Sequence, residues 1–225
     1  MKGNKNKWAG DKYKAERDEM ANNMKKRKIK TTRGKEKEGF KAQFREAWKY
    51  LRESKNYIWA IALIFLGGAL LGFVFSGSLG FLDEFLREIV GQIEGLSSFE
   101  TIIFILQNNL ASSFYGILLG VVLGIFPVLN ALLNGVLVGY VFKLTWLDSG
   151  ISEFWKILPH GIFELPAAFI SLGLGLRLGM FVFSKHKWKE FMKRARNSII
   201  IFVCVVIPLL IVAAVIEGLL IGAYK

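Results

Sequence analysis

Long apolar blocks restrict what this chain can fold into more than any other feature. Hydrophobic residues make up 53% of the sequence, more than is usual in soluble domains. They gather in five blocks, each near the roughly 20 residues that a helix needs to cross a bilayer. The blocks cover about 57–75, 102–126 (with a start between 102 and 110), 128–147, 161–183 and 199–216. The sequence therefore predicts an all-α, polytopic transmembrane helical bundle of about five spans, with interfacial amphipathic helices.

Basic residues gather in two places, and this predicts the orientation of the chain. Residues 1–56 carry 19 Lys and Arg against 8 Asp and Glu, and Lys185–Arg196 carries six against one. Basic charge beside apolar spans marks the cytoplasmic side. With five spans, both blocks lie on that side. We therefore expect a multi-pass protein of the cell membrane with a cytoplasmic N-terminus and an external C-terminus.

The same basic charge indicates which partners to expect. Basic segments beside a membrane attract anionic lipid head groups, so the lipid bilayer and its anionic lipids are the expected partners of both basic blocks. A basic arm can also bind nucleic acid. This arm is tethered to a membrane and has no recognisable nucleic-acid module, so we expect no nucleic-acid partner.

Three regions follow from these patterns. Residues 1–39 form a Lys- and Asn-rich cytoplasmic arm that we expect to be disordered. Residues 40–56 repeat apolar residues at helical spacing among basic ones, which predicts an amphipathic juxtamembrane helix. Residues 57–222 form the transmembrane domain. Its first block begins at Tyr57, and we expect it to act as an uncleaved signal anchor.

Two segments between the spans also have an amphipathic pattern. Apolar residues of 81–96 share one helical face and acidic residues lie on the other, which predicts an interfacial helix. A second, basic interfacial helix is predicted within Lys185–Arg196. The second and third spans meet at Pro127 without a charged residue between them. Either a very tight turn joins them, or one of them is re-entrant, which requires its backbone to be buried in protein or to line a wet cavity.

The most specific motif is the run Leu158–Ala167, which places His160 and Glu164 four residues apart at the start of the fourth span. On a continuous helix these two residues share a face. Pro159 suits the first turn of a helix, with Gly161 following, whereas Pro166 should kink the span or start a second segment. Ionisable residues at membrane depth are costly and suggest a functional site.

Three interpretations of this motif stay open. The first is a structural His–Glu hydrogen bond that pins a kinked helix. The second is a polar intramembrane site, lined also by Asn108, Asn109 and Asn134, that recognises a substrate or conducts protons or ions. The third is a metal or catalytic site. Zinc usually takes three or four protein ligands, and no such spacing is present, so no metal ligand, catalytic residue or cofactor is predicted.

Two other charged residues lie inside apolar blocks. Arg177 lies about two turns from the end of the fourth block and can snorkel or pair with a carboxylate. Lys143 is close to the end of the third block, where we expect it to snorkel. We predict no functional role for either residue.

Small residues recur at four-residue intervals in three of the blocks. They are Gly116, Gly120 and Gly124 in the second span, Gly135 and Gly139 in the third, and Gly175 and Gly179 in the fourth. Such stripes let helix backbones approach closely in lipid. We interpret them as packing of spans two, three and four within the chain, with a homodimer through one stripe as the alternative.

These residues resemble the stage II sporulation protein M family. Pro159–Ala167 is similar to the signature of that family, and Asn108–Asn109–Leu110, Asn134–Gly135 and Gly139 occur in the order that the family shows. The resemblance covers about Tyr57–Tyr224. It implies a polytopic membrane protein. In spore-formers the family member works at the engulfing septal membrane as a scaffold for cell-wall-degrading partners, while relatives also occur where no spores form. No enzymatic activity is implied.

Three functions are therefore compared. The favoured one is a non-enzymatic membrane scaffold or assembly component with membrane or envelope proteins as partners. The second is a transporter or permease-like component that uses the polar site at His160 and Glu164. The third, an intramembrane metalloenzyme, has the least support from the residues.

Overall fold

The computed structural model describes residues 38–39, 41–93, 95–150 and 154–223. Within helices, the side chains of residues 90, 93, 149, 154–160 and 217–223 are outside this description. The chain divides into two units, residues 1–46 and 47–225. In the first unit, residues 41–46 are helical, and almost all of the predicted arm lies outside the described residues. The second unit begins with helical residues 47–53, which we call the junction helix.

The described residues form helices and turns without a strand, which confirms the all-α prediction. Five helical stretches among them are long and apolar enough to cross a membrane. The helices are α2 (Lys55–Val74), α3 (Leu82–Ile93), α4 (Ser98–Leu118), α5 (Ile125–Ser149), α6 (Phe154–Gly179), α7 (Lys187–Ile201) and α8 (Ile207–Ala223). Helices α7 and α8 belong to one of these stretches, Lys187–Ile216, whereas α3 lies outside all five. The stretch predicted over 161–183 has spanning character in the structure, within a helix that begins earlier, at Phe154.

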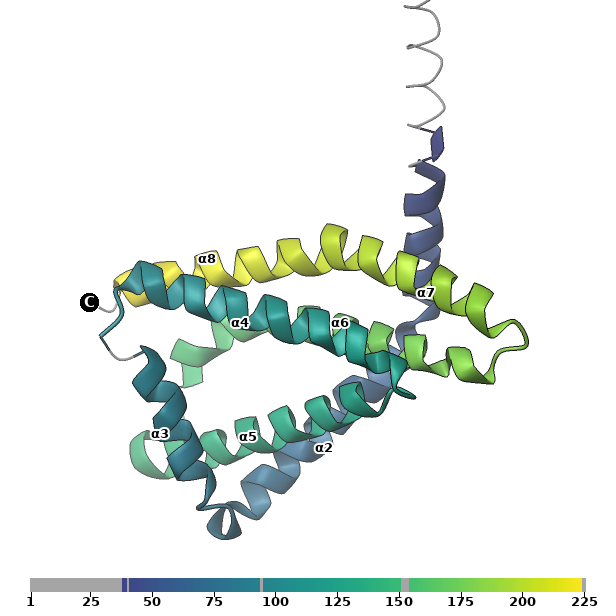
Figure 1. Ribbon diagram of the computed structural model, residues 1–225. Coiled ribbons are helices and arrows are strands. Elements are labelled where there is room, and N and C mark those ends of the chain that lie inside the picture. Colours follow the sequence, from purple (N-terminus) through teal and green to yellow (C-terminus); the bar gives the residue numbers. More distant parts are fainter. Residues whose placement is uncertain (1–37, 40, 94, 151–153, 224–225) are drawn as a thin grey trace, which may run out of the picture. The chain divides into compact units, whose positions relative to one another are not determined.

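Helix α6 is the centre of the second unit. It packs against α2, α4, α5 and α8, and its membrane-length stretch is the most buried of the five. Figure 1 shows α4, α6 and α8 side by side, and α2 beside α5. Apolar clusters fill the contacts, with Leu174 and Leu178 against Ile201 in one of them.

Helix α4 continues into a 3-10 turn at Leu119–Val121, and a turn of three residues, Val122–Gly124, then leads to α5. Leu123 and Gly124 take positive φ angles of 53° and 70°, and such a reversal is the conformation that glycine adopts most readily. Both flanking stretches have 24 residues of spanning character, so the structure supports the tight turn and not a re-entrant segment. The two spans meet at Val122–Gly124 and not, as the sequence predicts, at Pro127. Pro127 is the third residue of α5, where no helical partner exists for its missing N–H.

Pro159 differs from the prediction, and one of the two alternatives for Pro166 is excluded. Helix α6 begins at Phe154, so Pro159 lies inside the helix and not in its first turn. The helix continues through Pro166 without a second segment. Neighbouring helices can compensate for one missing backbone bond in a spanning helix, and α6 has neighbours on several sides.

The predicted basic helix and the fifth span form one helical stretch, from α7 through α8. A π-helical turn at Phe202–Val206 connects them. This wider turn comes just before Pro208, whose ring in a regular α-helix would meet the carbonyl oxygen of Cys204. The turn therefore keeps the helix continuous across a proline.

The amphipathic helix predicted over 81–96 is found as α3. In Figure 1 it runs across the direction of α2 and α5. The hydroxyl of Tyr140 in α5 donates a hydrogen bond of 2.6 Å to Oδ1 of Asp83, and Tyr140 is almost completely buried. This bond fixes the start of α3 on the side of α5.

Candidate functional site

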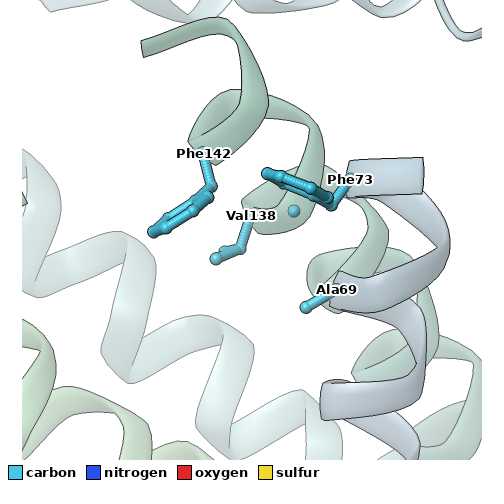
Figure 2. Close-up of a pocket in the computed structure, with 5 residues that line it drawn as sticks. Ala69, Phe73, Val138 and Phe142 are labelled. Carbon is cyan, nitrogen blue, oxygen red and sulfur yellow. The ribbon is translucent and has the colours of Figure 1, made fainter. Parts of the chain in front are cut away.

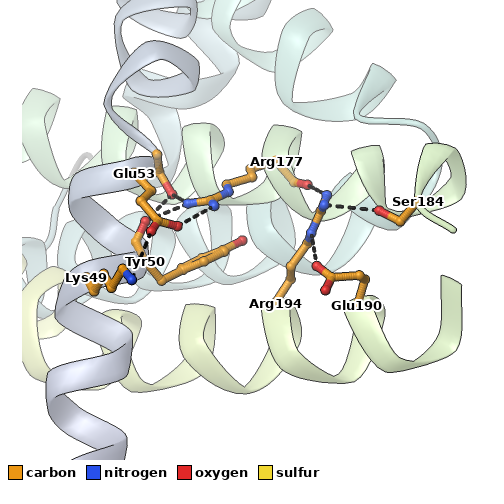
Figure 3. Close-up of polar contacts among 8 residues, drawn as sticks. Lys49, Tyr50, Glu53, Arg177, Ser184, Glu190 and Arg194 are labelled. Atoms are coloured by element: carbon orange, nitrogen blue, oxygen red, sulfur yellow. Dashed lines mark hydrogen bonds and ion pairs between the residues drawn. The ribbon is translucent and has the colours of Figure 1, made fainter. Parts of the chain in front are cut away.

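A charged side chain inside a spanning stretch has the most extensive set of polar contacts among the described residues. Arg177 in α6 donates hydrogen bonds to the carbonyl oxygen of Tyr50 (2.7 Å), to Oγ of Ser54 (2.9 Å) and to Oε2 of Glu53 (3.0 Å). Its side chain is only 16% exposed. These contacts join α6 to the junction helix (Figure 3).

The end of the junction helix makes these acceptors available. The chain turns at Ser54, and the last carbonyl groups of a helix have no partner within it. The oxygen of Tyr50 accepts from the backbone N–H and the hydroxyl of Ser54 at 3.0 and 2.8 Å. Arg177 adds a charged donor, and a cation is favourable at a helix C-terminus. The arginine therefore completes a cap.

Tyr50 and Glu53 contribute to the same contact in different ways. The guanidinium carbon of Arg177 lies 4.1 Å from the centre of the Tyr50 ring, a cation–π distance. The hydrogen bond from Arg177 lowers the pKa of the Glu53 carboxyl below its ordinary value. Burial raises the pKa of the Tyr50 hydroxyl, and nearby Ser198, Arg177 and Arg194 offset part of this effect. Arg177 therefore contacts the anionic carboxylate of Glu53 and the neutral ring of Tyr50.

A second arginine extends the contact to α7. Arg194 donates to the carbonyl oxygen of Arg177 at 2.8 Å and to Oγ of Ser184 at 3.2 Å, and it pairs with Glu190 at 3.4 Å. The carbonyl of Arg177 belongs to the last turn of α6, so Arg194 caps α6 as Arg177 caps the junction helix. We call Tyr50, Glu53, Ser54, Arg177 and Arg194 the Arg177 junction (Figure 3).

Buried polar atoms lie beside this junction. The hydroxyls of Tyr50 and Ser198 and both amide atoms of Asn197 have no hydrogen-bond partner within the described residues. Asn197 and Ser198 belong to α7 and are fully buried. Unsatisfied buried groups are costly in an apolar environment, so bound water is the ordinary way to satisfy them.

The predicted polar site is only partly described. His160 lies in α6, but its side chain is outside the described residues. Glu164 is half-buried and has an interaction partner. On α4, Asn108 is exposed and Asn109 half-buried. Asn134 of α5 donates to the carbonyl oxygen of Asn130 at 2.9 Å, one turn back in its own helix. A shared polar site of these residues stays a prediction.

The glycine stripes face backbones of other spans within the chain. A Cβ added to Gly120 would collide with the backbone of Gly175 in α6, and one added to Gly179 would collide with the α4–α5 turn at Gly124. Gly116 faces the side chain of Leu172. These contacts advance along both chains together, so α4 and α6 are parallel neighbours in contact at their glycines.

The third span packs differently from the prediction. Gly135 and Gly139 of α5 lie against the backbone of Phe65 and Ala69 in α2, the first span. In return, Gly68 and Gly72 of α2 lie against α5. The glycine face of span three therefore meets span one, and this pair is also parallel, while α5 contacts α6 as well. The stripe of α2 is absent from the sequence interpretation, although its two glycines are four residues apart.

A hollow lies beside this pair. It has a volume of about 240 Å³ and is lined by Ala69 and Phe73 of α2 and by Val138, Gly139 and Phe142 of α5 (Figure 2). We call it the α2–α5 groove. None of the predicted polar residues lines it. No group of three or more potential metal ligands occurs among the described residues.

Comparison with known proteins identifies the family. The sequence profile of the stage II sporulation protein M family matches residues 55–220. The chain belongs to that family. The match begins with the first residue of α2 and ends within α8, so it includes all five candidate spans. Searches of curated proteins and of solved structures gave no match to the chain.

Within this member of the stage II sporulation protein M family, the sequence interpretation missed the importance of Arg177. It allowed a carboxylate partner but did not name one, and the partner comes from 124 positions earlier. The position of Arg177 was itself a signal, because an arginine two turns inside a span needs polar or charged partners in the hydrocarbon region. Glu53 and Ser54, at the edge of the first span, could have been named as its nearest polar candidates.

Proposed function

We propose that this integral membrane protein is a non-enzymatic scaffold or assembly component of the cell membrane. Support comes from the way in which its spans are held together. Glycines place α2 on α5 and α4 on α6 backbone to backbone, and the Arg177 junction fastens α6 to the helices that flank it. Interfaces of small residues leave little space for sliding, so the bundle is suited to holding partners in a fixed arrangement.

An outward face of α2 is the surface that we propose for a partner membrane protein. Trp59, Leu63, Leu66, Leu70 and Val74 follow each other at helical spacing and are all at least 60% exposed. The opposite face of the same helix is the glycine face that packs on α5. One side of α2 therefore builds the bundle, and the other side is free for lipid or for a neighbouring helix.

The basic segments give the proposal a second part. The N-terminal arm and α7 are expected to hold the anionic head groups of the cytoplasmic leaflet, with the N-terminus cytoplasmic and the C-terminus external. The Arg177 junction joins the junction helix and α7 to α6. Lipid binding by the basic segments would therefore be coupled to the spans. A homodimer remains a proposal for the same exposed faces.

A transporter or permease-like component is the second candidate. One observation favours it: Glu164 lies half-buried within the spanning stretch Gly161–Phe183. Carboxylates inside membrane segments are common in proton and ion pathways. His160 stands one turn before it on α6. If a polar pathway runs through this pair, α6 lines the path of the transported proton or ion instead of being a structural centre.

Photo-crosslinking in native membranes tests the scaffold. A photoreactive residue at Leu63 or Leu70 should give discrete adducts with a second membrane protein, whereas one at buried Ile61 should not. The double variant His160→Ala/Glu164→Ala should keep these adducts if it remains folded. Absence of defined adducts, or their loss in the folded double variant, would contradict the scaffold.

The same variants separate the other candidates. Proteoliposomes containing a pH-sensitive dye would report proton flux driven by a potassium gradient. Flux in the wild-type protein that disappears in the double variant supports the transporter. Stoichiometric zinc or iron in the purified full chain would instead support the metalloenzyme interpretation. The scaffold predicts neither result.

A further inference from the structure

The α2–α5 groove is an apolar hollow on the surface of the spanning bundle. All five of its lining residues are apolar (Figure 2). It exists because Gly139 has no side chain and Ala69 has a small one, so the helices touch there while the rings of Phe73 and Phe142 extend beyond the contact. A water molecule needs several polar partners, which this lining does not offer. An apolar group must therefore fill the groove.

The size of the groove restricts the occupant. Its volume of about 240 Å³ is below the range typical of pockets for drug-sized molecules, about 300–1,000 Å³. The lining extends over about one helical turn of α2, from Ala69 to Phe73, and of α5, from Val138 to Phe142, which is about 6 Å along the helices. A segment of a single hydrocarbon chain that runs along the helices fits these dimensions.

A cation lies beside the groove, and it indicates which kind of lipid head group the site would bind. The ammonium of Lys143 lies 4.7 Å from the centre of the Phe73 ring, which is itself part of the lining. Lys143 is half-buried, and no carboxylate pairs with it within the part of the chain that the structure describes. Asp83 of the neighbouring α3 accepts a hydrogen bond from Tyr140 instead. A half-buried ammonium in this position is favourable for an anion.

The neighbouring aromatic residues indicate the level of the head groups. Trp146 packs against both Phe73 and Phe142, with ring centres 5.7 and 6.0 Å apart. Tryptophan and lysine near the end of a spanning helix are typical of the membrane interface. Lys143 lies between this level and the groove. An anionic head group at Lys143 would therefore have an acyl chain directed along the groove.

We propose that the groove and Lys143 form a binding site for one anionic phospholipid of the surrounding bilayer. The phosphate contacts the ammonium of Lys143, and one acyl chain lies on Ala69, Val138 and Gly139 between the two phenylalanine rings. The site is at the C-terminal ends of α2 and α5. Helix α6 runs antiparallel to α5, so the basic α7, which follows the C-terminal end of α6, lies at the opposite end of the bundle. This lipid is therefore distinct from those expected at the basic segments.

Native mass spectrometry of the full chain tests this site, with phosphatidylglycerol or phosphatidylcholine added to the detergent-solubilised protein. We expect one phosphatidylglycerol to remain bound when other lipids have dissociated, and phosphatidylcholine not to remain. Lys143→Gln should weaken retention about fivefold, the effect of one cation near an anionic lipid. Val138→Trp should fill the groove and displace the chain. Val138 is an exposed position, so this change is compatible with folding.

Matched variants show whether the two halves of the site hold the same lipid. Lys189→Gln changes a cation of α7, and Leu133→Trp adds a ring on exposed α5 surface outside the groove; both should leave the retained lipid in place. If one lipid contacts both parts, the losses from Lys143→Gln and Val138→Trp are not additive. Equal retention of phosphatidylcholine, unchanged retention in Lys143→Gln, or a change of oligomeric state without lipid loss in Val138→Trp would each overturn the proposal.

Discussion

Arg177 donates a hydrogen bond of 2.7 Å to the carbonyl oxygen of Tyr50, although 127 positions separate the two residues. The bond closes the C-terminus of one helix with the side chain of another. Because the same guanidinium contacts Glu53 and the ring of Tyr50, one side chain carries several interactions that hold α6 on the junction helix.

Replacement of Arg177 should therefore destabilise the bundle even when the charge is kept. Lysine cannot reproduce the fork of donors or stack on the ring. We expect Arg177→Lys to lower the free energy of unfolding by about 2 kcal/mol, the scale of hydrogen bonds to a charged group. Thermal unfolding of the detergent-solubilised chain measures this. Arg87→Lys, the same change on an exposed residue of α3, is the control and should have no effect.

Low pH should weaken the contact between Arg177 and Glu53, because the Glu53 carboxylate becomes protonated. The hydrogen bond from Arg177 lowers the pKa of Glu53 in the folded chain below its ordinary value of 4.5. The unfolded chain then binds the proton more readily, so the contribution to stability is complete above pH 4.5 and is lost as the pH falls through the lowered value. Melting temperatures between pH 3 and 6 should show a smaller acid dependence in Glu53→Gln than in the wild type. An equal dependence in both would refute this, and Glu84→Gln is the control.

Replacement by alanine should have opposite effects on stability at a glycine that contacts another helix and at one that does not. A Cβ at Gly139 collides with the backbone of Ala69, whereas a Cβ at Gly67 meets nothing within 4 Å. Gly139→Ala should cost about 1–3 kcal/mol, the usual cost of overpacking. Gly67→Ala should be neutral or stabilising, because alanine favours helices by up to about 1 kcal/mol. Chemical unfolding in detergent measures both, and similar values for the two would show that the helices do not touch at Gly139.

Tyr140→Phe should release α3 without disturbing the spans. Phenylalanine fills the same buried space but cannot donate to Asp83, at a cost of about 1 kcal/mol. Hydrogen exchange should become faster in α3 and stay unchanged in α5. Tyr115→Phe removes the hydroxyl of an exposed tyrosine in α4 and should change neither helix. Faster exchange throughout the bundle would mean that the bond is part of the core.

Sequence patterns located most elements because the signal for each is local. The fourth span lies where the sequence predicts it, and the amphipathic helix is within a few residues of its predicted range. Errors occurred at prolines. Pro127 looks like an interruption in the sequence but belongs to the first turn of a helix, and Pro159, expected in a first turn, lies inside α6. The effect of a proline depends on its position in the helix and on its neighbours.

The site could be predicted less completely. His160 and Glu164 attract attention because they are adjacent on one helix, yet the described contacts centre on Arg177, whose partners come from distant parts of the chain. In the same way, the spacing of Gly135 and Gly139 reveals a packing face but not the helix that it meets. A stripe of small residues fits any other stripe of similar spacing.

The sequence by itself determined that this chain is a helical membrane protein of the stage II sporulation protein M family with five candidate spans. Helical hydrogen bonds are local, and the length of an apolar block must match the thickness of a bilayer, so both can be counted along the chain. The stripes also predicted that α4 packs on α6, but only the tertiary structure decided that α2 meets α5 and that Arg177 closes the junction helix. These pairings depend on which surfaces of similar composition fit together in three dimensions, and no local pattern encodes that choice.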